Sequence, residues 1–110
     1  MSTSKETVAH IVDLLSPLGD VRALAMFGEY GVYCDHKLFA LICSDTLFLK
    51  ITKPTEDATL DRVPPYQGAS PYHQVTEDWL EDPDRLLALA AQVRDALPKP
   101  KKVPKRLLKP

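Results

Sequence analysis

The chain has 110 residues, 45% hydrophobic and 26% charged, with a formal net charge of −1, as in one soluble globular domain rather than a disordered or collagenous chain. The longest apolar run, residues 38–43, is far shorter than the ~20 residues that span a bilayer, so no membrane span is expected. Only Cys34 and Cys43 are cysteines and no apolar signal segment opens the chain, which predicts a cytoplasmic protein without a disulfide framework.

A first helix is predicted over residues 4–16. Thr3 and Glu6 have the spacing of a capping box, and apolar residues then recur at helical intervals through Leu18. Pro17 and Gly19 end the pattern.

Strands are predicted between Val21 and Ile51, where aromatic and β-branched residues dominate. Two polar pairs, Asp35-His36 and Ser44-Asp45, interrupt this segment and have the character of two-residue hairpin turns. Such turns would set Ala40 opposite Gly31 on one side and opposite Leu49 on the other.

This register predicts a sheet with two apolar faces. One face would pack against a helix that approaches closely where Gly31 meets Ala40. The opposite face also needs cover, either from the last helix or from a partner or second subunit. Its candidate partner or dimer residues are Tyr30, Val32, Phe39, Leu41 and Phe48, beside Cys43.

The glycines of the segment Gly28-Glu29-Tyr30-Gly31 are interpreted as fold-critical. A phosphate-binding loop would need the G-x-G-x-x-G spacing or a Walker lysine, and neither is present. A tight turn or bulge at Gly28 and a packing role for Gly31 explain the pattern better.

The second half of the chain alternates loops with short elements. We expect a short helix over residues 54–62, a strand over residues 70–75 at an edge or beginning after Pro71, and a single helical turn from Thr76 to Trp79. Asp82-Pro83 predicts a helix start, and its apolar face continues to Leu97.

These elements predict an α+β fold: an antiparallel sheet of four to five strands, with helices from both chain ends packed on it in two layers. Residues 1–97 would form the domain and residues 98–110 a basic, proline-rich and flexible tail.

No catalytic, cofactor or metal site is predicted. Cys34, His36 and Cys43 lack the paired spacing of zinc ligands, and the proposed hairpin sets the cysteines at opposite ends. Cys34 remains a candidate nucleophile for an enzyme of unknown chemistry, because a partner histidine could come from elsewhere in the fold. His10 and His73 are interpreted as solvent-facing or structural. The acids between Glu77 and Asp84 suit the starts of helices.

The tail carries a charge opposite to that of the domain. Residues 1–97 hold eight of the 14 basic residues and all 15 acids, a net charge of −7, whereas the tail has six cations and no acid. The cations are candidate contacts for weak, sequence-independent nucleic-acid binding. The alternatives are docking on the acidic domain, or a membrane-surface or partner contact through Leu107-Leu108. The cations are Lys99, Lys101, Lys102, Lys105, Arg106 and Lys109.

The order of motifs resembles the N-terminal domain of the TfoX/Sxy family, bacterial proteins linked to natural competence. The resemblance rests on Met26-Phe27-Gly28, Tyr30-Gly31, Tyr33, Phe39-Ala40-Leu41, Asp45, Leu47 and Leu49-Lys50, and more weakly on Tyr72, Leu80, Asp82-Pro83 and Leu86-Leu87.

This resemblance implies an α+β fold without catalytic residues. Longer members of the family resemble transcriptional co-activators that act with the cyclic-AMP receptor protein. The expected function is therefore that of a non-enzymatic protein-interaction domain, an accessory of transcription or competence, with a protein partner and a homodimer as one option.

Overall fold

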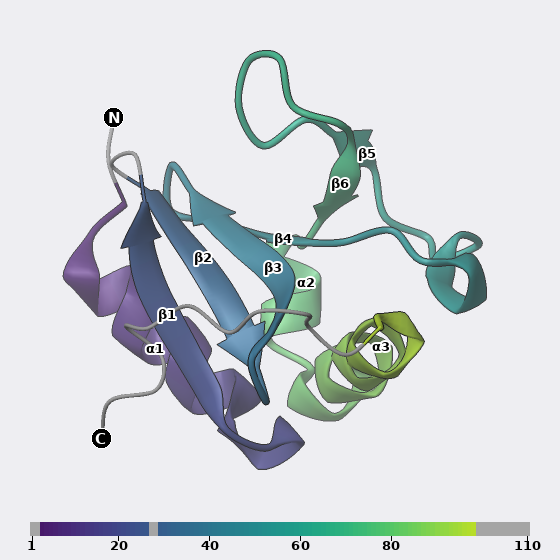
Figure 1. Cartoon of the computed structure of the whole chain (residues 1–110), viewed down its shortest axis with the longest axis horizontal. Coiled ribbons are helices and arrows are strands. Elements are labelled where there is room, and N and C mark those ends of the chain that lie inside the picture. Colours follow the sequence, from purple (N-terminus) through teal and green to yellow (C-terminus); the bar gives the residue numbers. More distant parts are fainter. Residues whose placement is uncertain (1–2, 27–28, 99–110) are drawn as a thin grey trace.

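The computed structural model describes residues 3–26 and 29–98. One antiparallel sheet contains six strands in the order β1-β2-β3-β4-β6-β5 (Figure 1). The predicted α+β class is confirmed, with at least one strand more than expected. The elements are α1 (Lys5–Leu15), η1 (Ser16–Leu18), β1 (Val21–Met26), β2 (Glu29–Cys34), β3 (Lys37–Cys43), β4 (Thr46–Leu49), η2 (Lys53–Thr55), β5 (Arg62–Val63), β6 (Tyr72–Gln74), α2 (Glu77–Leu80) and α3 (Pro83–Ala96).

Side-chain caps begin the two longest helices. Ser4, rather than the predicted Thr3, caps α1, because its hydroxyl oxygen accepts the backbone N–H of Thr7 at 3.2 Å. Asp82 caps α3 and Pro83 occupies the first helical position, as predicted. Among the described residues, no helix has the length and apolarity needed to cross a membrane.

Both predicted hairpin turns are present. The backbone φ angles of Asp35, His36, Ser44 and Asp45 are 50°, 71°, 50° and 59°. Positive φ at both central residues is typical of the type I′ turn, whose twist suits a two-residue hairpin. These turns set Tyr33 opposite Leu38 at the start of the first hairpin.

A β-bulge then changes the register of the first hairpin. Tyr33 pairs with Leu38 but Val32 pairs with Ala40, so Phe39 is an extra residue in β3. Gly31 consequently faces Leu41 instead of the predicted Ala40. The second hairpin keeps its predicted register, with Ala40 opposite Leu49.

The main core lies between the sheet and the helices α1 and α3, which cover the same face. The bulge turns Val32 and Phe39 into this core, where both are fully buried, and Tyr30 packs at its edge. Val32 and Phe39 were predicted on the opposite face, and the prediction is wrong for them. Tyr30 was predicted there too, and it also lines a hollow on that face. The core contains Ile11, Leu15, Val32, Cys34, Phe39, Ala40, Ile42, Leu47, Leu49, Val75, Trp79, Leu86, Leu89, Ala90 and Val93.

We call the opposite side of the sheet the outer face. Leu41, Cys43 and Phe48 form a second buried cluster there, as predicted for Leu41 and Phe48. The last helix does not cover this cluster, because α3 shares the main core with α1. Val63 and Tyr72, from the β5–β6 part of the sheet, pack against it instead.

The β5–β6 part of the sheet departs from the predicted elements. Residues 54–62 hold the end of η2 and the start of β5 rather than one helix. β6 lies between β4 and β5, so it is not an edge strand, and Pro71 directly precedes it. The loop from residue 64 to residue 71 projects beyond the sheet at the top of Figure 1.

Gly31 has a packing role, but on the outer face. A Cβ atom on Gly31 would lie 3.1 Å from Leu38 Cδ1 and from Met26 Cε and Sδ. The expectation that Gly31 faces a helix is therefore wrong, since its neighbours are two side chains of the sheet itself. Gly28 lies outside the described residues.

Gly31→Val is expected to lower the free energy of unfolding by about 1 kcal/mol through overpacking against Met26 and Leu38. Both neighbours are flexible side-chain ends that can shift, so Gly31→Ala should cost less than Gly31→Val. Urea denaturation of both variants measures the difference. A loss above about 3 kcal/mol for valine would mean that rigid backbone, not side chains, limits the space.

Candidate functional site

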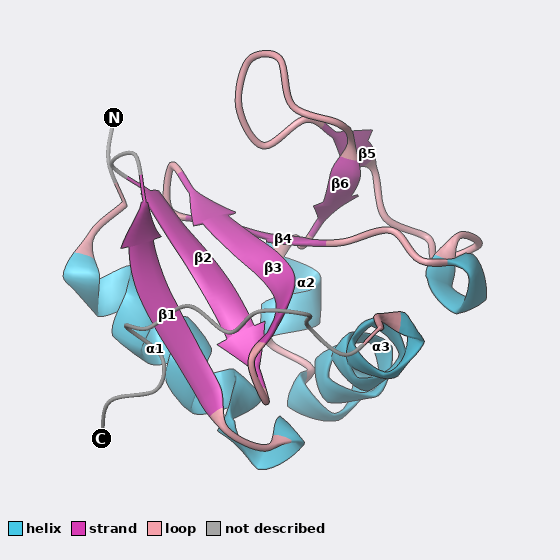
Figure 2. Cartoon of the chain, viewed as in Figure 1, coloured by secondary structure: helices cyan, strands magenta, loops and turns pink. Residues whose placement is uncertain are grey.

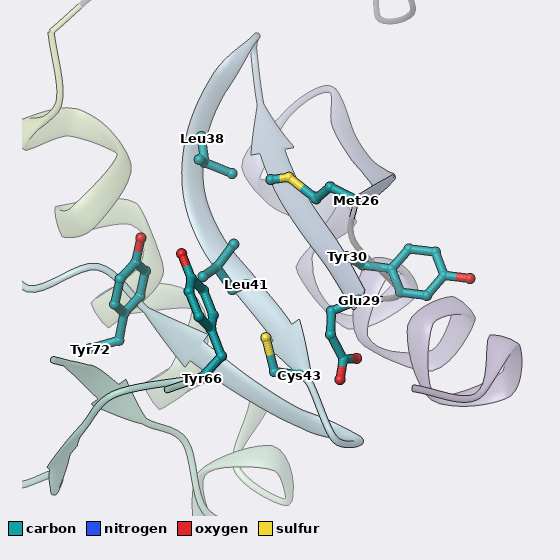
Figure 3. A pocket seen from close by; sticks show the side chains of 8 residues that line it. All are labelled: Met26, Glu29, Tyr30, Leu38, Leu41, Cys43, Tyr66 and Tyr72. Carbon is teal, nitrogen blue, oxygen red and sulfur yellow. The ribbon is translucent and has the colours of Figure 1, made fainter. Parts of the chain in front are cut away.

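An apolar groove of about 400 Å³ runs along the outer face. Leu38, Leu41 and Cys43 follow one another along β3, with Met26 of β1 on one side and two tyrosines on the other (Figure 3). We call this hollow the outer-face groove. Its lining residues are Met26, Glu29, Tyr30, Leu38, Leu41, Cys43, Tyr66 and Tyr72.

Two tyrosines form the wall opposite the strands. Tyr66 comes from the loop before β6 and is 59% exposed, the one exposed large hydrophobic residue in the described ranges. Tyr72 of β6 is partly buried, and burial raises the pKa of its phenol, with Tyr66 and Cys43 adding to the shift. Figure 3 shows the two rings side by side, with both hydroxyl groups pointing the same way. The ring of Tyr30 points away from them.

Glu29 places one fixed negative charge at an end of the groove. One carboxylate oxygen accepts the backbone N–H of Thr3 at 3.1 Å and also the Thr3 hydroxyl. The other accepts the backbone N–H of Ser44 at 3.2 Å. Asp45 in the same turn accepts the N–H of Ser4 at 2.8 Å, which lowers the pKa of Asp45. The start of α1 is thereby attached to the β3–β4 turn.

The other end of the groove lies beside the end of α3. Lys37 precedes the groove residue Leu38, and its ammonium group donates to the carbonyl of Arg94 at 3.2 Å. The guanidinium of Arg94 donates to the carbonyl of Leu18. The last turn of α3 is therefore tied both to the start of β3 and to η1.

The cysteines lack the environment of reactive thiols. Cys34 and Cys43 are free and buried. Burial raises the pKa of both thiols, and nearby Asp35 and Glu29 respectively add to the effect. A reactive cysteine needs the opposite, an exposed thiol with a lowered pKa. Among residues 3–26 and 29–98, no group of three or more His, Cys, Asp or Glu side chains is placed to hold a metal ion.

A second hollow, of about 370 Å³, lies between η2 and α3. The guanidinium carbon of Arg85 stands 3.8 Å from the ring centroid of Trp79, a cation–π contact at its wall. The lining of this hollow includes the charged residues Asp57 and Arg85, whereas, of the described residues that line the outer-face groove, Glu29 alone is charged. The second hollow is the weaker candidate for an apolar partner.

The site residues predicted from sequence have separate locations. Leu41 lines the groove and Phe48 packs in the cluster beneath it. Val32 and Phe39 belong to the main core. The cations between Lys99 and Lys109 lie outside the described residues. Sequence reasoning missed Met26, Leu38, Tyr66 and Tyr72 as groove residues.

Comparison with known proteins identifies the family. A family model described as the TfoX N-terminal domain matches residues 13–97. The chain belongs to this family. A relative from Spirochaeta aurantia, named "Uncharacterized 12.7 kDa protein in trpE 5'region", is 34% identical over 103 residues, which cover 92% of this chain and 89% of the relative.

The match to the TfoX N-terminal domain contains every residue that lines the outer-face groove. It does not include Thr3 and Ser4, which fasten the start of α1 to the β3–β4 turn, or the basic tail. The groove is therefore built by the family domain itself.

Proposed function

We propose that this TfoX N-terminal domain is a non-enzymatic protein-interaction module that serves as an accessory to transcription, including the regulation of competence. The observation that carries the proposal is Tyr66, a large ring 59% exposed at the wall of an apolar groove. Partly exposed aromatic residues beside a hydrophobic pocket are preferred anchors of protein interfaces.

The chemistry of the groove defines the partner segment. Its walls are aliphatic and aromatic, and Glu29 is the one charged residue among those that line it. A segment that presents an aliphatic side chain next to a lysine or arginine would complement both features. The tyrosine hydroxyls would hydrogen-bond to the backbone of such a segment. Family resemblance points to the transcription machinery, including the cyclic-AMP receptor protein, as its source.

Quantitative co-purification from the native host tests the proposal. We expect the tagged chain to retain a transcription protein, and Tyr66→Asp to reduce that retention at least tenfold by placing a charge at the groove wall. Gln92→Asp is the matched control, because Gln92 is exposed at the second hollow and the change adds the same charge. Its retention should equal that of the unaltered chain.

Two outcomes would contradict the proposal, one for the groove as the contact surface and one for the role in transcription. If Tyr66→Asp retains the transcription protein fully, the groove is not the contact surface. If no transcription protein is retained by the unaltered chain, the accessory role in transcription is wrong. Circular dichroism verifies that Tyr66→Asp is folded, as expected for a residue in an exposed loop.

A further inference from the structure

Part of the outer face has no helix of the described chain over it. Helices α1 and α3 pack on the other side of the sheet, and no described helix lies over β1, β2 and β3 on this side (Figure 2). Leu24, Met26 and Leu38 are only partly buried there. An apolar sheet face of this kind requires cover from another chain segment or a partner.

The described chain ends close to this face. Leu97 closes the last turn of α3 by donating its N–H to the carbonyl of Arg94 at 3.3 Å. The same carbonyl accepts from Lys37, the neighbour of Leu38 at one end of the groove. The segment that follows Pro98 therefore starts near the Leu38 end of the groove.

The segment is long enough to reach every part of the groove. Leu107 is nine residues beyond Pro98, and an extended chain covers about 3.3 Å per residue, or roughly 30 Å. From Leu38 to Cys43 the groove follows five residues of β3, roughly 17 Å. The extended tail is therefore longer than the groove, even if its path bends.

The segment also has the chemistry that the groove requires. Leu107 and Leu108 form an adjacent aliphatic pair, with Arg106 before them and Lys109 after them. These cations complement Glu29 and the net charge of −7 over residues 1–97. Prolines at positions 100, 104 and 110 restrict the unbound segment, which reduces the entropy lost on docking.

We propose that residues 99–110 of the same chain occupy the outer-face groove, with Leu107 and Leu108 against its apolar wall and their flanking cations near Glu29. The tail thereby serves as an intramolecular ligand of the TfoX N-terminal domain. A partner segment that binds the same groove would have to displace the tail. The inference rests on the groove and the tail alone, so either proposal can fail while the other holds.

Paramagnetic relaxation in the full-length chain tests the inference. A spin label is attached at Pro110→Cys, where it leaves the leucine pair intact. The native cysteines are buried and should not react with the reagent. We expect strong broadening of the amide signals of Glu29, Leu38 and Tyr66, with the signals of His10 and Gln92 unchanged.

A second labelled variant is the control for specific docking. Combining Pro110→Cys with Leu107→Asp and Leu108→Asp should reduce the broadening at the groove at least fivefold, while circular dichroism stays unchanged. Equal broadening in the aspartate variant, or broadening spread evenly over all faces, would overturn the proposal.

Two further samples distinguish other occupants. Isotope-labelled chain without a spin label, mixed with spin-labelled chain, should show no broadening at the groove. If it does, the tail of a second copy is the occupant and the intramolecular assignment is wrong. If the groove shows no broadening and the amide signals of the tail shift only on adding short duplex DNA at physiological salt, the tail contacts nucleic acid instead and the proposal is overturned.

Discussion

Phe48→Glu is expected to destabilise the domain by about 4 kcal/mol or more and to leave little folded protein. Phe48 is only 5% exposed and packs with Leu41 and Cys43 in the second cluster. It sits in β4, with β3 on one side and β6 on the other. The change removes a buried aromatic ring and places a carboxylate where Val63 and Tyr72 cover the site. Domains are stable by only about 5–15 kcal/mol, so this loss is large.

Phe48→Leu is the matched control, because it keeps an aliphatic side chain and should cost only about 1 kcal/mol. Urea denaturation followed by circular dichroism measures both variants. Analytical ultracentrifugation tests the alternative expected from sequence, in which Phe48 lies in a dimer interface. A well-folded monomeric Phe48→Glu derived from a dimeric parent would support that interface and contradict the packing described here.

The stability of the domain is expected to fall on acidification, and His73 is the cause. His73 is fully buried in β6, opposite Leu49 and Arg62 in the sheet register. Burial lowers the pKa of its imidazole from the ordinary 6.5, and the charge of Arg62 acts in the same direction. The backbone of Thr55 opposes the shift, but no described residue makes a well-formed hydrogen bond to either ring nitrogen.

The direction of this pH dependence follows from proton linkage. Because the pKa of His73 is lower in the folded state than in the unfolded state, the unfolded chain binds more protons at acid pH. The contribution of His73 is complete above pH 6.5 and is lost as the pH falls from there toward the folded-state pKa. For one proton, the free energy of unfolding changes by at most about 1.4 kcal/mol per pH unit.

Urea denaturation between pH 7.5 and pH 5 measures this slope. His73→Leu should flatten it, because the variant has no group to protonate at that position. His10→Gln is the control, since His10 is exposed on α1 and the change likewise removes one imidazole. A slope in His73→Leu as steep as in the parent would show that other groups cause the acid sensitivity.

Local chemistry was sufficient to predict α1, α3 and the two hairpin turns. Asp82-Pro83 marks the start of α3 through a side-chain acceptor and a residue that needs no donor, both independent of the rest of the fold. Asp35-His36 and Ser44-Asp45 predict hairpins because two-residue turns require positive φ, which short polar side chains tolerate. The family match confirms the resemblance seen in the sequence.

The tertiary structure alone decided which side chains share a face. Phe39 is a single extra residue in β3. It changes which residues of β2 share a face with the rest of β3, because side chains alternate with a period of two. No residue type in the segment marks that bulge. The sequence therefore predicted two apolar faces correctly but placed Val32 and Phe39 on the wrong one.

The groove depends on contacts that are distant in the sequence. It combines Met26 of β1 with Tyr66 and Tyr72, which follow β5 and approach only because β6 pairs with β4. The same pairing buries His73, which sequence reasoning left as either solvent-facing or structural. Turn chemistry and helix caps are local and can be read from neighbouring residues. The pairing of β6 with β4 and the bulge depend on how the whole core packs, so only the folded chain determines them.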